Sequence, residues 1–144
     1  MRRLIPLLLL LTACVQDRPR PEPLEDEERA NLFVAVRKPA NNATVFGNRP
    51  LDVEIYALDV TGFRLTGHGY VVRRNGVKLD SVVRRFTARA DSGRVFQYSV
   101  PDLPTNTQID ISGLAFGSKG EALEGPPVML VVVRCTTGIP GCQP

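Results

Sequence analysis

Residues 70–81 read YVVRRNGVKLDS, two runs of β-prone residues on either side of Asn75-Gly76. An Asn-Gly pair favours a two-residue type I′ turn, because both of its positions require positive φ angles. The turn fixes a hairpin register whose successive pairs are Arg74–Val77, Arg73–Lys78, Val72–Leu79 and Val71–Asp80. Side chains alternate between the two faces of a strand, so this register predicts a half-buried hairpin. The side chains expected to face the core are Tyr70, Val72, Val77 and Leu79, and those expected to face solvent are Arg73, Lys78 and Asp80.

The rest of the sequence from residue 31 to residue 134 alternates in a similar way between turn residues. Leu51, Val53 and Ile55 alternate with Asp52 and Glu54, a pattern typical of a half-buried strand. The segments expected to form strands are 32–36, 51–56, 70–74, 77–81, 82–86, 95–100, 109–116 and 128–133. Turns are expected at 39–42, 59–62, 91–93, 101–106, 117–120 and 125–127. Seven or eight strands in about 100 residues predict an all-β antiparallel β-sandwich, with a small closed barrel as the alternative.

Arg84 and Arg85 are neighbours within the segment 82–86. In a regular central strand one of two adjacent side chains points into the core, where an unpaired charge is costly. The two arginines therefore predict an edge strand or a bulge at this position. Charged edges also discourage edge-to-edge aggregation.

Several stretches of the chain carry a resemblance to a known family. They are Pro39 with Gly47, residues 51–59 with Gly62, residues 98–104 and residues 109–117. Through these stretches the span from about residue 34 to residue 133 resembles the bacterial Ig-like domains of secreted and surface proteins. It departs from antibody-type Ig domains because it lacks the core Trp, the inter-sheet Cys pair and a tyrosine corner. The resemblance implies an Ig-like sandwich, and such domains serve as spacers, adhesins or assembly modules.

The first residues have the pattern of an export signal. Arg2 and Arg3 precede the short apolar run 4–11, which is too short for a transmembrane helix of about 20 residues. The sequence LTAC at 11–14 then resembles the lipobox of bacterial lipoproteins. That resemblance implies cleavage before Cys14, diacylation of its thiol by fatty acids such as palmitate, and acylation of its new amine. An ordinary signal peptide is the alternative.

The resemblance to lipoproteins also gives an expected localisation and domain division. Because Val15 and not Asp follows the cysteine, sorting rules in some two-membrane bacteria favour the outer membrane. Residues 14–30 carry the lipidated cysteine and a stretch rich in Pro and acidic residues, which is expected to be a disordered tether. The expected division is a signal peptide at 1–13, the lipidated linker at 14–30 and an Ig-like domain at 31–144.

The sequence offers few residues suited to catalysis. His68 is the single histidine of the chain and lies between Gly67 and Gly69. A catalytic site of the Ser-His-Asp kind would need it as the base, but no nucleophile motif accompanies it. Neither a calcium-loop pattern nor a Gly-rich phosphate loop is present. We therefore expect a protein that is not an enzyme and has no cofactor or metal, with an enzyme centred on His68 as a distant alternative.

Two cysteines remain once Cys14 is assigned to lipidation. Cys135 and Cys142 enclose the Gly- and Pro-containing loop CTTGIPGC. An even pair of cysteines in an exported chain predicts a disulfide. The bridge is expected to hold the C-terminal tail beside the last strand.

A basic cluster is the candidate binding site. Eight Lys and Arg residues fall between positions 64 and 94, against Asp80 and Asp91. The residues assigned to the candidate binding face are Arg73, Lys78, Arg84 and Arg85. Because residues 31–144 carry 13 Lys and Arg against nine Asp and Glu, an excess too modest for the basic stripe of a nucleic-acid binder, no nucleic-acid partner is expected. The face could instead bind an acidic protein, anionic envelope glycans or lipid head groups, or it could be a solvated surface that keeps an edge strand soluble.

Taken together, the sequence predicts a bacterial membrane-anchored lipoprotein that carries a single Ig-like binding module. Its expected role is that of an accessory or assembly subunit of an envelope complex. The alternative is a structural spacer or an adhesin-like module that contacts peptidoglycan or anionic glycan.

Overall fold

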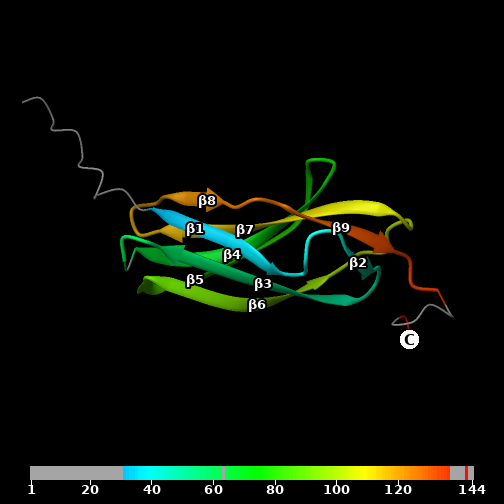
Figure 1. Ribbon diagram of the computed structural model, residues 1–144, viewed down its shortest axis with the longest axis horizontal. Coiled ribbons are helices and arrows are strands. Elements are labelled where there is room, and N and C mark those ends of the chain that lie inside the picture. The colour runs from blue at the N-terminus through cyan, green and yellow to red at the C-terminus, as the bar shows by residue number, and fades with distance from the viewer. Residues whose placement is uncertain (1–30, 63, 137–141, 143–144) are drawn as a thin grey trace, which may run out of the picture.

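The computed structural model describes residues 31–62, 64–136 and 142, and these form a β-sandwich of two sheets (Figure 1). The smaller sheet has the strand order β1 (Leu32–Lys38), β3 (Pro50–Asp59) and β6 (Asp91–Ser99). The larger sheet has the order β2 (Ala43–Phe46), β9 (Val128–Val133), β7 (Thr107–Gly117), β4 (Leu65–Arg74) and β5 (Val77–Arg89), with β8 (Ala122–Glu124) paired to β7. The predicted all-β sandwich is confirmed.

The strands differ from the expected set in number and in one pairing. The described residues form nine strands. The short strands β2 and β8 were not expected, and residues 77–89, which were expected to form two strands, form the single strand β5. All pairs are antiparallel except β2 with β9, which run parallel. β2 reaches this position because the turn after β1 carries the chain from the smaller sheet to the edge of the larger one.

The predicted hairpin forms with the expected turn but changes register after two pairs. Asn75 and Gly76 have φ angles of 51° and 78°, as a type I′ turn requires. Beyond the Arg73–Lys78 pair the register shifts, so that Val72 pairs with Asp80 and Leu79 is the extra residue of a bulge. A shift of one residue exchanges the two faces of a strand. The expected position of Asp80 is therefore wrong, since Asp80 lies on the core-facing side opposite Val72, and Leu79 is not buried in the core as expected.

The exposed fractions of the side chains in this hairpin follow from the shifted register. Tyr70 and Val72 are buried as expected, whereas Val77 is 67% exposed and Leu79 is 41% exposed. The tip between β4 and β5 extends away from the body of the sandwich, where no strand of the other sheet covers it (Figure 1). At the tip, the alternation of apolar and polar residues therefore does not lead to burial of the apolar side chains. The expectation that Val77 faces the core is wrong.

The expected turn at 91–93 is also wrong. Residues 91–93 belong to β6 and pair with Leu58, Ala57 and Tyr56 of β3. The chain instead turns at Ala90 and crosses from the larger sheet to the smaller one. Pairing with a strand distant in the sequence outweighs the local preference of Asp, Ser and Gly for a turn.

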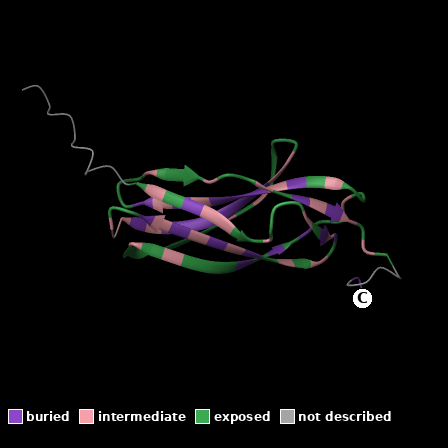
Figure 2. Ribbon diagram, viewed as in Figure 1, coloured by how far each residue is buried: buried purple, intermediate pink, exposed green. Residues whose placement is uncertain are grey.

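The core lies between the two sheets (Figure 2). Its largest fully buried apolar side chains come from five strands and are Val34, Val53, Ile55, Leu65, Tyr70, Val72, Ile109, Ile111, Leu130 and Val132. No helix within the described residues has the length and apolar character needed to cross a bilayer.

Candidate functional site

One side of the sandwich is formed by two edge strands. β5 is the last strand of the larger sheet and β6 is the last strand of the smaller sheet. The chain runs from β5 through Ala90 directly into β6 (Figure 1). The edge strand predicted from Arg84 and Arg85 is therefore confirmed, and the β4–β5 register also shifts opposite Leu65 and Gly67. Edge strands present unpaired backbone N–H and C=O groups, which a partner can bind.

Arg84 and Arg85 lie on opposite faces of β5. Arg84 pairs with His68, which is only 1% exposed and faces the second sheet. Arg84 shares that side but stays exposed because it lies on the edge strand. Arg85 pairs with Gly67 on the outer side, and its guanidinium carbon lies 4.1 Å from the centroid of the Phe116 ring. The four residues of the candidate face are thus not all on one face.

Arg73 is already engaged within the protein. Its Nη2 donates a hydrogen bond to Glu124 Oε2 at 2.9 Å, and its Nη1 donates to Oε1 of the same carboxylate. These side-chain hydrogen bonds raise the pKa of Arg73 and lower the pKa of Glu124. The repulsion between Arg73 and its paired Lys78 is therefore offset by Glu124 of β8, while Asp80 faces the other way. Lys78 itself is exposed near the hairpin tip.

A different set of arginines lies near His68, on the side of the sandwich that is formed by the edge strands β5 and β6. We call this side the open side. Arg94 of β6 pairs with the fully buried Ile55, so it lies on the core-facing side of the smaller sheet. Burial lowers the pKa of His68; a backbone hydrogen bond with Ser92 opposes this shift, and the charges of Arg94 and Arg89 lower the pKa further. Both arginines are therefore close enough to act on the imidazole. We call the set formed by Arg84, Arg89 and Arg94 the basic edge.

The charges of the basic edge are not neutralised by ion pairs. Ion pairs in the described part of the chain include Lys38–Glu54, Arg73–Glu124 and Arg134–Asp102. None of them includes a residue of the basic edge. Arg89 lies over the Phe86 ring with its guanidinium carbon 4.6 Å from the centroid. Three positive charges from two sheets thus face solvent together, which favours an anionic partner.

His68 itself packs as a core residue between the sheets. Its ring makes edge contacts with Phe86 and Phe96, at centroid distances of 5.3 and 5.4 Å. Because burial lowers its pKa, the imidazole is neutral at pH 7. Its Nδ1 atom has no hydrogen-bond partner among the described residues.

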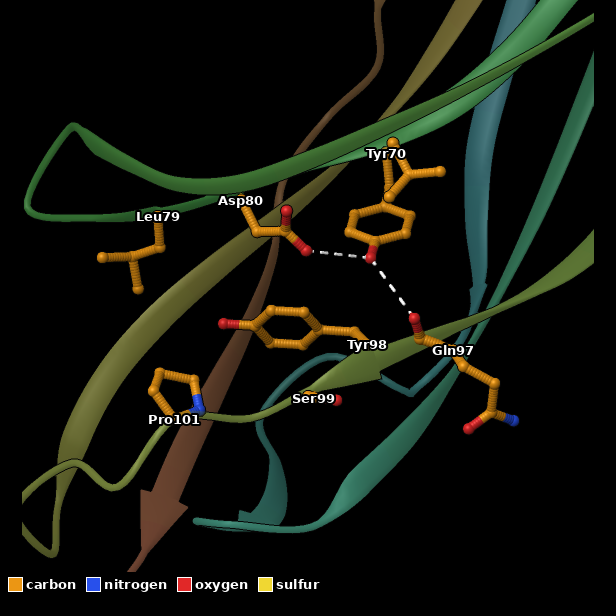
Figure 3. Close-up of a pocket in the computed structure, with 8 residues that line it drawn as sticks. Tyr70, Leu79, Asp80, Gln97, Tyr98, Ser99 and Pro101 are labelled. Carbon is orange, nitrogen blue, oxygen red and sulfur yellow. Dashed lines mark hydrogen bonds between the residues drawn. The ribbon is translucent and has the colours of Figure 1, made fainter.

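A pocket that the sequence did not indicate lies farther along the same open side (Figure 3). It has a volume of about 470 Å³ and is open to solvent. Its lining residues are Tyr70, Leu79, Asp80, Val82, Gln97, Tyr98, Ser99 and Pro101. We call it the Tyr98 pocket. The sequence pattern missed it because the bulge at Leu79, which brings Asp80 to this side, leaves no local signal.

Hydrogen bonding in the Tyr98 pocket is incomplete. The Tyr70 hydroxyl donates to Asp80 Oδ2 at 3.1 Å, and Asp80 Oδ1 accepts a bond from the Ser81 N–H at 2.8 Å. The Tyr98 hydroxyl is buried and has no hydrogen-bond partner among the described residues. Burial and the charge of Asp80 raise the pKa of Tyr98 to about 12, and the same two causes raise the pKa of Tyr70.

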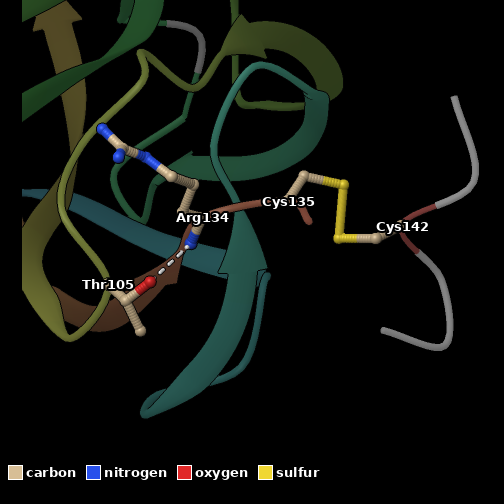
Figure 4. Close-up of a disulfide and its surroundings, with 4 residues drawn as sticks. All are labelled: Thr105, Arg134, Cys135 and Cys142. Carbon is tan, nitrogen blue, oxygen red and sulfur yellow. Dashed lines mark hydrogen bonds between the residues drawn. A yellow bond between two sulfur atoms is a disulfide. The ribbon is translucent and has the colours of Figure 1, made fainter. Parts of the chain in front are cut away.

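The C-terminal cysteines lie just beyond β9 (Figure 4). Cys135 and Cys142 are joined by a disulfide, with their Cα atoms 5.3 Å apart. The preceding residue is fixed to the domain, because the Arg134 N–H donates to Thr105 Oγ1 at 3.1 Å and the Arg134 side chain pairs with Asp102. The disulfide therefore begins at an anchored point of the fold.

Reduction of this disulfide is expected to lower the free energy of unfolding by about 2–3 kcal/mol, because the closed loop restricts the unfolded chain. Urea unfolding followed by tyrosine fluorescence, with and without dithiothreitol, measures the change. The Cys135→Ser/Cys142→Ser variant is the control and should not respond to the reductant. An unchanged midpoint of the wild type after complete reduction would contradict the expectation.

Two further predictions concern lipidation of Cys14 and the lack of a metal site. Cys14 lies outside the described residues. Within the described ranges, no three His, Cys, Asp or Glu side chains come together as a metal site.

No protein-family model matches the chain, and no curated protein matches it. Fibronectin(III)-like modules of Clostridium thermocellum CbhA align with 17% sequence identity and a TM-score of 0.49, over 74% of this chain and 47% of theirs. The CARDB domain of a Pyrococcus furiosus protein, in complex with di-metal ions, aligns with 13% identity and a TM-score of 0.48, over 74% of this chain and 90% of that one. The chain thus spans about half the length of the first of these structures. The assignment of the fold rests on the two sheets themselves.

Proposed function

We propose that this protein is a lipid-anchored bacterial envelope protein that acts by binding and not by catalysis. In this proposal Cys14 carries the lipid anchor in the outer membrane. The β-sandwich binds an acidic partner protein through the basic edge, as an accessory or assembly subunit. The observation that carries the proposal is that Arg84, Arg89 and Arg94 lie on the His68 side of two sheets, with no carboxylate pairing them among the described residues.

The two edge strands favour a protein as the partner. β5 and β6 each end a sheet, so their outer backbone groups are available to an added strand. An extended acidic segment can bond to such an edge through its main chain and to the arginines through its carboxylates. A glycan lacks the regular main-chain donors and acceptors that match a strand edge. A glycan-binding spacer or adhesin remains the alternative function.

The proposal predicts that charge reversal at the basic edge weakens association at least about tenfold, because placing like charges together in an interface costs several kcal/mol. The variant is Arg84→Glu/Arg94→Glu. The protein is purified from its own membranes in a gentle detergent, and co-purifying proteins are quantified by mass spectrometry against the wild type. Cys14→Ala is included because loss of the anchor is expected to remove both the membrane association and the partner.

The matched control is Arg74→Glu/Lys78→Glu at the hairpin tip. It makes the same change of charge on the larger sheet and lies away from His68. Equal partner recovery from the wild type and the basic-edge variant would overturn the assignment of the site. Equal losses in the basic-edge variant and the control would also overturn it. Binding to purified cell-wall sacculi without an enriched protein would favour the glycan alternative.

A further inference from the structure

The Tyr98 pocket differs from the basic edge in its electrostatics. Among its lining residues Asp80 carries a negative charge and none carries a positive charge. The remaining polar groups come from the two tyrosines, Ser99 and the backbone carbonyl of Gln97, because the Gln97 side chain points away from the pocket and donates to Asp52 (Figure 3). A pocket of this composition on an otherwise arginine-rich side of the molecule disfavours anions and favours cations.

The hydrogen-bonding positions of Asp80 and Tyr98 that remain unoccupied also favour a cationic ligand. The Asp80 carboxylate offers about four acceptor positions, of which Tyr70 and the Ser81 N–H occupy two. Tyr98 is only 3% exposed, and its hydroxyl has no hydrogen-bond partner within the described part of the chain, although a buried hydroxyl normally has one. Figure 3 shows this hydroxyl directed into the space between Leu79, Asp80 and Pro101. A donor-rich group in that space would satisfy both side chains.

The walls of the pocket define the rest of the ligand. Leu79, Val82 and Pro101 give it an apolar lining, and the rings of Tyr70 and Tyr98 add aromatic surface. Apolar walls accommodate a hydrocarbon stem, and aromatic rings attract a cation at close range. We propose that the Tyr98 pocket binds a primary ammonium group on an aliphatic stem, the chemistry of a lysine side chain. The ammonium donates to Asp80 and Tyr98, and the stem lies against Leu79 and Pro101.

The probe is n-butylammonium chloride, with 1-butanol as a neutral compound of similar shape. Both are titrated into the full chain while NMR follows the signals of Tyr70, Tyr98 and Ser99. The ammonium is expected to shift these signals in a saturable way, and 1-butanol is expected to bind at least about tenfold more weakly, since hydrogen bonds to charged groups are the stronger ones. Equal binding of the two compounds would overturn the proposal.

Two variants test the residues, and a third is the control. Asp80→Asn removes the charge, and Tyr98→Phe removes a hydroxyl that none of the described residues hydrogen-bonds. Each is expected to weaken binding of n-butylammonium at least about tenfold, while Tyr98→Phe keeps the wild-type midpoint of thermal unfolding or raises it. Asp110→Asn, on β7 outside the pocket, should bind as the wild type does. Unchanged binding by Tyr98→Phe and Asp80→Asn would refute the site.

Discussion

Gly69→Ala is expected to lower the free energy of unfolding by at least about 3 kcal/mol, at the upper end of what overpacking costs. Gly69 lies in β4, paired with Val83 of β5. A Cβ atom at this position would overlap the backbone carbonyl oxygen of Val82 and would lie 3.0 Å from the Val83 Cα atom. Backbone cannot move aside as a flexible side chain can, so the β4–β5 pairing must open or shift.

Gly93→Ala is the matched control for this prediction. Gly93 lies in β6, and a Cβ atom there would be 3.7 Å from Tyr56 Cδ2, which is ordinary van der Waals contact. The control is expected to leave stability unchanged or to raise it by a few tenths of a kcal/mol, because Ala restricts the unfolded chain. Urea unfolding followed by circular dichroism compares the two variants. A Gly69→Ala midpoint as high as that of Gly93→Ala would contradict the close approach of β4 and β5.

Leu130→Ala is expected to lower the free energy of unfolding by about 3–4 kcal/mol, as deletion of a fully buried leucine does. Leu130 is 0% exposed in β9, where it pairs with Ile109 of β7 and Ala43 of β2. The substitution leaves a cavity between the sheets that neighbouring strands fill only in part. The same urea titration measures the loss.

Leu79→Ala makes the same substitution at a bulge. Because the Leu79 side chain is 41% exposed, we expect a loss of no more than about 1 kcal/mol. The comparison distinguishes the observed register from the one that the turn alone predicts, in which Leu79 faces the core. A loss at Leu79 as large as that at Leu130 would support the regular register and would also remove Asp80 from the Tyr98 pocket.

The features that were predictable from the sequence are those set by neighbouring residues. Asn75-Gly76 determined the type I′ turn because both positions require positive φ angles. Alternation determined the all-β class, and the adjacent Arg84 and Arg85 determined the edge position of β5. In each case steric or electrostatic preferences within a few residues are sufficient, whatever the rest of the chain does.

Only the tertiary structure decided which residues meet at the open side. The bulge at Leu79 changed the face on which Asp80 lies, and pairing with β3 turned the expected turn at 91–93 into a strand. Arg89 of β5 and Arg94 of β6 both act on His68, and Asp80 lies near Tyr98, because β5 and β6 end their sheets on the same side. These arrangements depend on contacts between distant segments that compete for pairing and packing. Local sequence preferences are too weak to decide that competition, so both the basic edge and the Tyr98 pocket are products of the assembled sandwich.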